Sequence, residues 1–159
     1  MKIIRILVLP LLLTMHGLAS GGINTGHTAY KQGDYDTALR EWRPLAEQGN
    51  AGAQLNLGFM YDNGFGVSQN YNEAIKWYRK AAEQGNDRAQ YNLGLMYDSG
   101  DGVQQDYVQA YMWYNIVAVD SGDGEAIAIS YRDYVAREMT PDQVARAEKL
   151  SREWRGKHP

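Results

Sequence analysis

The sequence predicts an all-α fold: a right-handed α-α superhelix in which antiparallel helix pairs stack as a solenoid, closed by C-terminal capping helices. The first observation is a period, because Tyr35, Tyr71 and Tyr107 stand 36 residues apart and whole segments recur at the same spacing. The second is that each period divides into two helix-length segments with helical apolar spacing, separated by turns that contain glycine. Self-similarity at this spacing is typical of proteins in which each repeat buries its apolar face on the next.

The N-terminal segment, residues 1–19, differs in composition and is expected to be a secretory signal peptide. Lys2 and Arg5 precede an apolar run at 6–13, and small residues stand where a signal peptidase cleaves, after Ala19. An uncleaved membrane anchor is the competing interpretation. The run is shorter than the ~20 apolar residues that span a bilayer, so we expect no stable membrane insertion after cleavage.

Composition favours one exported domain without disulfides. The chain contains no cysteine, which excludes lipid attachment at the cleavage site and leaves stability to the hydrophobic core. Removing residues 1–19 leaves 14 basic residues against 19 acidic ones, a formal charge of −5. This balance, without a basic run, argues against nucleic acid as a partner. We expect a periplasmic or secreted protein.

The region 22–122 holds the repeats, with an abridged copy at about 23–50 and full copies at about 51–86 and 87–122. In the abridged copy the opening helix is expected at 23–32, and the turn after it lacks five residues of the full copies.

Each full copy is expected to contain two helices joined by a turn. In the first full copy these are 51–63 and 72–84, and Gly64 follows the first because glycine favours the left-handed conformation that ends a helix. Small residues such as Gly58 are expected to let the paired helices approach closely. The residues expected to face inward are Ala53, Leu57, Met60, Tyr61, Ala74, Ile75, Tyr78, Ala81 and Ala82.

Residues 123–159 are expected to form two capping helices. The second begins at Thr140, where Thr140 and Gln143 make a capping box and Pro141 occupies the first helical position. The apolar stripes expected to be buried are Ile127, Tyr131, Tyr134 and Val135 in the first helix, and Val144, Ala147, Leu150 and Trp154 in the second.

The residues that recur every 36 positions resemble the pattern of the Sel1-like repeat family, whose members are relatives of the tetratricopeptide repeat with a longer turn between the helices. The resemblance covers Gly26 to about Gly122, with Val117 where the family prefers alanine, and the tail resembles the family's closing helices. It implies an adaptor that binds another protein, of the bacterial exported type. The matching positions are Ala53, Leu57, Gly58, Tyr61, Gly64, Gly66, Val67, Ala74, Trp77, Tyr78, Ala81, Ala82 and Gly85, and again Ala89, Leu93, Gly94, Tyr97, Gly100, Gly102, Val103, Ala110, Trp113, Tyr114, Ala118 and Gly122.

A partner-binding surface is predicted on the first helix of each full copy. We take Leu57 as the centre of the helix face that packs into the core and count about 100° of rotation per residue. The side opposite Leu57 then carries Leu55, Phe59 and Asp62, and the equivalent positions recur in the next copy. Apolar residues there, with acidic ends, predict a groove on the concave face for a peptide or helix of an envelope protein. The competing interpretation is packing between neighbouring repeats. The predicted site residues are Leu55, Phe59, Asp62, Arg88, Tyr91, Leu95 and Asp98.

Two further interpretations remain open. One is a glycan- or peptidoglycan-binding module that uses aromatic rings as stacking platforms, which burial of Trp77 and Trp113 would disfavour. The other is self-association through the exposed ends of a short stack.

An enzyme is not expected, and neither is a cofactor or a metal. The three histidines lie in the signal segment and near the two ends of the mature chain, without metal-binding spacing. Some cysteine-rich relatives have been proposed to act on β-lactams, but this chain lacks those cysteines and a Ser-x-x-Lys motif. The acidic turns at 98–102 and 120–124 lack the ligand pattern of a calcium loop and are better explained as turns.

Overall fold

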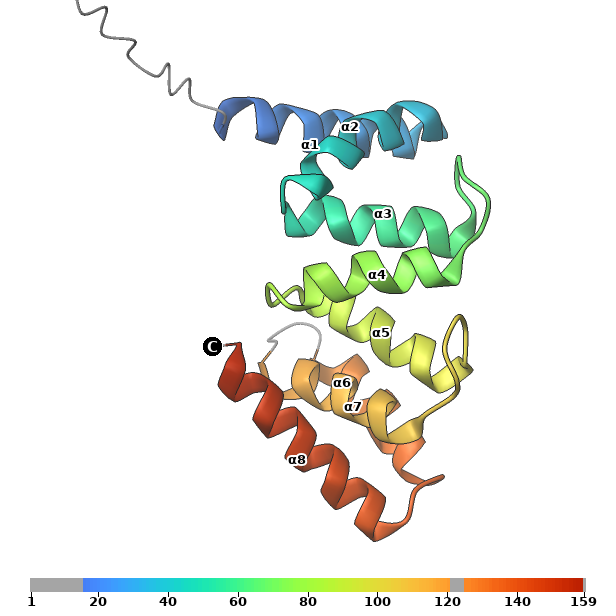
Figure 1. Ribbon diagram of the computed structural model, residues 1–159, viewed down its shortest axis with the longest axis vertical. Coiled ribbons are helices and arrows are strands. Elements are labelled where there is room, and N and C mark those ends of the chain that lie inside the picture. The colour runs from blue at the N-terminus through green and yellow to red at the C-terminus, as the bar shows by residue number, and fades with distance from the viewer. Residues whose placement is uncertain (1–15, 121–124, 159) are drawn as a thin grey trace, which may run out of the picture.

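The computed structural model describes residues 16–120 and 125–158, and within these ranges it consists of eight helices without a strand. The helices follow one another down an elongated column, with α1 and α2 at one end and α8 at the other (Figure 1). From α1 to α7, each helix packs against the next one in the chain, and α8 packs mainly against α6. The predicted all-α stack is therefore confirmed. The bounds are α1 (His16–Lys31), α2 (Tyr35–Glu47), α3 (Ala51–Asn63), α4 (Tyr71–Ala82), α5 (Asp87–Ser99), α6 (Tyr107–Asp120), α7 (Glu125–Ala136) and α8 (Pro141–Lys157).

The helix bounds agree closely with those expected in the first full repeat. Helix α3 covers the predicted range, 51–63, and α4 is shifted by one or two residues from 72–84. Helix α1 is longer than the predicted 23–32, because it already begins at His16. The expected signal peptide lies outside the described residues except for its last four, which form the first turn of α1, and the predicted turn at 120–124 lies outside them apart from its first residue.

Side chains and glycines fix the ends of the helices in each repeat. The Asn50 side chain accepts a hydrogen bond from the backbone N–H of Ala53 at 2.9 Å, and Asn86 does the same one repeat later for Ala89 at 3.0 Å. Helix α3 ends at Gly64, whose φ of 71° is the left-handed conformation expected there. The repeated sequence therefore specifies repeated helix boundaries.

Glycines set the distance between paired helices. A Cβ on Gly58 would lie 2.5 Å from Cδ1 of Tyr78, and a Cβ on Gly94 would lie 2.5 Å from Cε1 of Tyr114. Both tyrosines are fully buried. The close approach predicted from the small residue is confirmed. Of the nine residues expected to face inward in the first full repeat, eight are buried and Tyr61 is half-buried.

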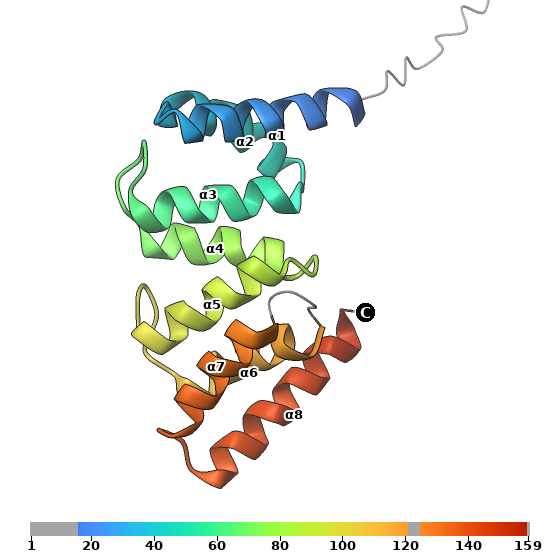
Figure 2. The same ribbon diagram turned by 180° about the vertical axis from the view of Figure 1, so that it is seen from behind.

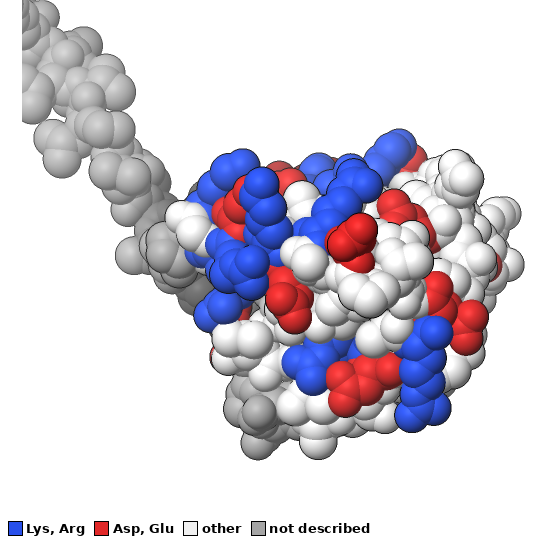
Figure 3. All heavy atoms as spheres, turned by 90° about the horizontal axis from the view of Figure 1, so that it is seen from below, with Lys and Arg blue, Asp and Glu red and all other residues white. Residues whose placement is uncertain are grey.

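Helix α8 closes the C-terminal end. It begins with the predicted capping box, in which Thr140 and Gln143 bond each other's backbone N–H groups. The Trp154 ring contacts Trp113 with centroids 5.4 Å apart, and the Asn115 side chain donates a hydrogen bond to buried Ser151 at 2.8 Å. Seen from this end, Lys, Arg, Asp and Glu side chains are mixed over much of the surface (Figure 3). A polar outer face is what a terminal cap requires.

The predicted buried stripe of α7 is largely wrong. Val135 is buried as expected, but Tyr131 is 39% exposed, and Ile127 and Tyr134 are each 57% exposed. Helix α7 packs on α6 through Ala128 and Val135, while α8 packs on α6 rather than across α7 (Figure 2). Because α8 packs on α6 and does not cover the outer side of α7, Ile127 and Tyr134 remain at the surface.

Candidate functional site

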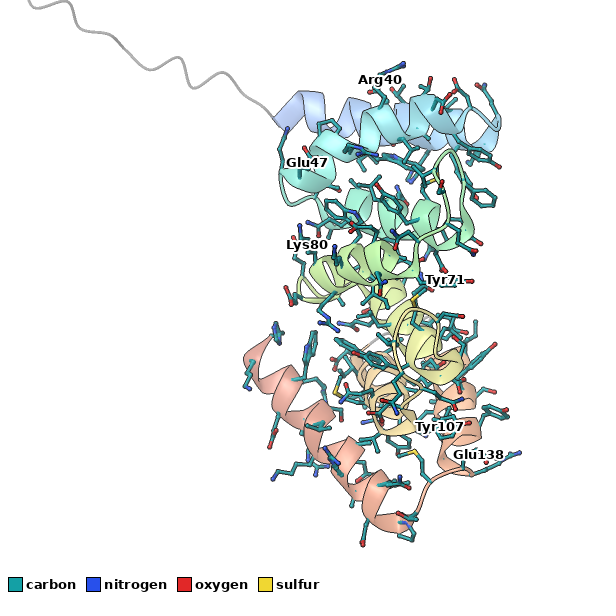
Figure 4. All side chains as sticks on the ribbon, turned by 45° about the vertical axis from the view of Figure 1, so that its right-hand side comes forward. Arg40, Glu47, Tyr71, Lys80, Tyr107 and Glu138 are labelled. Carbon is teal, nitrogen blue, oxygen red and sulfur yellow. The ribbon has the colours of Figure 1, made fainter. Side chains whose placement is uncertain are left out.

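The equivalent ends of α3 and α5 meet the exposed side of α7 at a pocket of about 470 Å³. Helix α3 contributes one aspartate, α5 contributes five of the ten lining residues, the turn after α5 contributes two, and α6 and α7 contribute one tyrosine each. We call this the aspartate–tyrosine pocket. Figure 4 shows Tyr107 on one side of the column and Lys80 on the other. The lining residues are Asp62, Asn92, Leu95, Met96, Asp98, Ser99, Asp101, Gln105, Tyr107 and Tyr134.

A glutamine holds the turn that forms one edge of the pocket. The Gln105 side-chain amide donates hydrogen bonds to the backbone oxygen of Asp98 at 2.7 Å and to the hydroxyl of Tyr107 at 3.1 Å. Gln69 makes the same pair of bonds one repeat earlier. The position of Tyr107 at the pocket therefore follows from the repeat itself.

The carboxylates of the pocket are partly withdrawn from water. Burial raises the pKa of Asp62, a hydrogen bond of 3.1 Å from the Tyr78 hydroxyl opposes this shift, and the negative charge of Asp101 adds to it. Burial also raises the pKa of Asp98. No lysine, arginine or histidine is among the residues that line the pocket, so none of its wall residues neutralises these charges.

The two full repeats differ in the hydrogen bonding of an equivalent tyrosine hydroxyl, that of Tyr78 in the first and that of Tyr114 in the second. The Tyr78 hydroxyl donates to Asp62, whereas the hydroxyl of Tyr114 is buried without a hydrogen-bond partner among the described residues. Burial raises the pKa of Tyr114, and the charge of Asp98 raises it further. The second repeat therefore places a buried hydroxyl with unused hydrogen-bonding capacity close to a pocket carboxylate.

Tyrosines from α5, α6 and α7 pack together in a cluster. Tyr91 contacts Tyr114 and Tyr131, with ring centroids 5.7 and 5.5 Å apart. Tyr131 also contacts Tyr114 at 5.6 Å. Since α7 carries both Tyr131 and Tyr134, this cluster fixes the helix that presents Tyr134 to the pocket.

The structure brings three of the predicted site residues together, namely Asp62, Leu95 and Asp98. Tyr91 does not line the pocket and belongs to the tyrosine cluster with Tyr114 and Tyr131. The remaining three lie elsewhere. Leu55 packs half-buried against the core, Arg88 is exposed on the first turn of α5, at the other end of that helix from Asp98, and Phe59 belongs to a separate aromatic group with Tyr30 and Phe65.

Sequence reasoning missed Asp101, Tyr107, Tyr131 and Tyr134. The column of tyrosines that contains Tyr107 was a usable signal, because a tyrosine recurs in every repeat directly after the turn between the paired helices. The exposure of Tyr134 could not be read from the sequence, since an apolar stripe on a capping helix predicts burial unless the path of the last helix is known.

The tryptophans do not line the pocket. Trp42 and Trp113 are buried. Trp77 is half-buried beneath Lys80, whose ammonium lies 4.4 Å from the ring centroid, and Trp154 stacks on His158. In the described part of the chain, no three histidine, aspartate or glutamate side chains are grouped so as to hold a metal ion. No helix within those residues has the length and apolarity to cross a membrane.

The Sel1 repeat family model matches residues 51–86 and 87–116. Among solved structures, the chain is similar to a protective antigen present in uropathogenic Escherichia coli strains that displays an SLR fold, with a TM-score of 0.82 and 33% identity over 88% of this chain and 30% of that one. It is also similar to a Sel1 repeat protein from Oxalobacter formigenes, with a TM-score of 0.66 and 33% identity over 82% of this chain and 55% of that one. The chain thus spans less than two thirds of either. No curated protein matches it.

Proposed function

We propose that this chain binds a partner protein on the surface formed by α3, α5 and α7, because it contains two Sel1 repeats and Sel1-repeat proteins generally act as scaffolds for protein–protein interactions. We call this surface the first-helix face. The bound element is a peptide or helix segment of an envelope protein, and the chain acts as an exported adaptor.

The aspartate–tyrosine pocket is the observation that supports this face most. It combines apolar and polar walls, and three of the five large hydrophobic residues that are exposed in the described chain lie on α7. Exposed apolar residues that gather on one face are typical of interaction surfaces. The opposite, charged surface of α8 offers no comparable patch.

The first-helix face is short, which limits the length of the partner segment that it can bind. Two full repeats and α7 supply three first helices, so the bound segment is a few turns of helix or a short extended peptide. Binding through one short segment is expected to be of moderate affinity.

A glycan ligand is less well supported. Stacking on sugars needs exposed aromatic faces, and three tryptophans are buried or covered by other side chains while the fourth lies beneath Lys80. The proposed adaptor role needs no catalytic group.

Affinity capture tests the proposal. The wild-type protein and Tyr134→Ser are incubated with extracts of the native cell envelope, and Arg40→Ser, an exposed change on α2, serves as the matched control. Tyr134→Ser is expected to lose the captured protein and Arg40→Ser to retain it, with both variants folded by circular dichroism. Capture that is equal for all three proteins would contradict the assignment of this face.

A further inference from the structure

The aspartate–tyrosine pocket has a charge imbalance that a specific ligand group would correct. Asp62, Asp98 and Asp101 line it, and none of the three forms an ion pair within the described residues. Asp101 accepts a hydrogen bond from Ser99 at 2.6 Å, and Asp62 accepts one from Tyr78. Within the described chain, no side chain donates a hydrogen bond to the carboxylate of Asp98, although this residue is half-buried, and the Gln105 amide reaches only its backbone oxygen.

Buried Tyr114 supplies an independent observation at the same place. Its ring lies on Gly94 in the way that Tyr78 lies on Gly58, yet its hydroxyl has no hydrogen-bond partner in the described structure. An unpaired polar group in the interior lowers the stability of the folded state, which makes such groups rare in folded proteins. The charge of Asp98 raises the pKa of Tyr114, so the unpaired hydroxyl lies near a carboxylate that a ligand in the pocket would contact.

The ligand group is best matched by a cation. A half-buried carboxylate without a positive neighbour is costly, and the cost falls when a hydrogen-bonded cation pairs with it. Tyr107 and Tyr134 also line the pocket, and the faces of aromatic rings attract ammonium and guanidinium groups. A neutral sugar could use the hydrogen-bonding groups but would leave the negative charge uncompensated.

We propose that the pocket binds the side chain of a lysine or arginine carried by the partner segment, with Asp98 and Asp62 as its carboxylate partners and Tyr134 over its stem. This inference rests on the proposed function and specifies the chemistry of the partner. A second copy of this chain is the alternative source of the cation. Three basic residues of α8, Lys149, Arg152 and Arg155, are paired with acidic side chains of their own chain, whereas Arg146 and Lys157 are exposed and form none of the ion pairs within the described residues. The dimerisation measurement below distinguishes a second copy from a separate partner.

Fluorescence anisotropy with a synthetic peptide library tests the proposal on the full mature chain. The library holds ten-residue labelled peptides with random apolar and polar flanks, and its central residue is arginine, lysine or citrulline, which has the shape of arginine without the charge. Arginine and lysine peptides are expected to bind at least about tenfold more tightly than their citrulline counterparts. Equal binding of the citrulline peptides, or no binding by any peptide up to millimolar protein, would overturn the inference.

Variants locate the interaction. Asp98→Asn is expected to weaken the arginine peptide about tenfold and to remove its advantage over citrulline. Asp87→Asn, which removes the same charge from the exposed first turn of the same helix, is the matched control and is expected to change the affinity less than twofold. Tyr134→Phe keeps a ring over the cation and is expected to retain binding, whereas Tyr134→Ser is expected to lose it. A loss of affinity that is equal for Asp87→Asn and Asp98→Asn would contradict binding in the pocket.

The outcomes separate this inference from the proposed function. If Tyr134→Ser abolishes envelope capture but charge at the peptide centre has no effect, the interaction face stands and the cation pocket does not. If neutral cell-wall glycan fragments bind and no peptide does, both fail. Concentration-dependent dimerisation that Asp98→Asn abolishes would identify a second copy as the ligand and overturn the inference of a separate partner.

Discussion

Gly58 and Gly94 determine how closely the two helices of each full repeat can pack. Each lies beneath the ring of a fully buried tyrosine, and the space for a methyl group is absent at both positions. The ring cannot move aside, because interiors are close-packed and both rings are enclosed by the core. The glycines are therefore required by packing, although glycine costs about 1 kcal/mol in a helix relative to alanine.

Gly58→Ala is predicted to destabilise the protein by about 2 kcal/mol, because the added Cβ would lie 2.5 Å from the Tyr78 ring and the overpacking outweighs the gain in helix propensity. The matched control is Gly52→Ala in the same helix, where a Cβ would meet only the Asn50 side chain at 3.4 Å. The control is expected to be neutral or stabilising by up to about 1 kcal/mol. Urea unfolding measures both changes, and a similar stability for the two variants would contradict the packing argument.

The burial of Asp98 is predicted to lower the free energy of unfolding of the protein as the pH rises from the ordinary pKa of an aspartate through the raised pKa of Asp98. Burial raises its pKa in the folded state, so the folded chain binds more protons than the unfolded chain between the ordinary value and the raised one. The groups facing it are Tyr114, and across the pocket Asp62, Asp101, Tyr107 and Tyr134.

Removing this carboxylate isolates its contribution. The free energy of unfolding of Asp98→Asn, relative to the wild type, is expected to be higher at pH 7 than at pH 3, because the wild type has the buried charge only at the higher pH. Urea unfolding at both pH values measures this, with Asp87→Asn as the control for loss of one exposed charge. A relative stability that is the same at both pH values, or lower at pH 7, would show that burial of Asp98 is not costly.

At the scale of the elements, α8 has a capped N-terminus and packs on the stack through one side. Thr140 caps its N-terminus, and one side of the helix covers α6 through Ser151, Leu150 and Trp154. The cap thereby buries Trp113 and leaves a charged outer face.

Thr140→Ala is predicted to destabilise the protein by about 1 kcal/mol, because it removes the hydroxyl that accepts from the backbone N–H of Gln143. Ser130→Ala, an exposed hydroxyl lost from the middle of α7, is the control and is expected to be neutral or slightly stabilising. Thermal unfolding followed by circular dichroism compares the two. An equal effect of both changes would mean that the cap contributes no more than an ordinary surface hydroxyl.

The elements also show what could be predicted from the sequence. The bounds of α3 and the capping box of α8 follow from local signals, namely apolar spacing, a glycine in the left-handed conformation and a Thr–Gln pair. The exposure of α7 depends on the direction that α8 takes after the turn between them, and no local sequence pattern predicts this direction. For that reason Asp62, Leu95 and Asp98 were predicted at the site, while Tyr134 was expected in the core.

At the scale of the whole molecule, the stack separates scaffold from binding surface. The repeated positions pack helix on helix, and the pocket forms where the repeat pattern ends and α7 replaces the first helix of a further copy. At the other end, α1 packs on α2 through Gly22, Ile23 and Gly26, all after the predicted cleavage site. The proposed export therefore leaves these contacts in place.

Photo-crosslinking in the native envelope tests the central claim, that the first-helix face binds a partner protein, most directly. A photoreactive phenylalanine analogue replaces Tyr134 at the pocket in one protein, and Arg40 or Lys80, both exposed outside the pocket, in two others. Position 134 is predicted to crosslink one or a few envelope proteins that positions 40 and 80 do not. Crosslinks to the same proteins from position 40 or 80, with none from position 134, would contradict the claim.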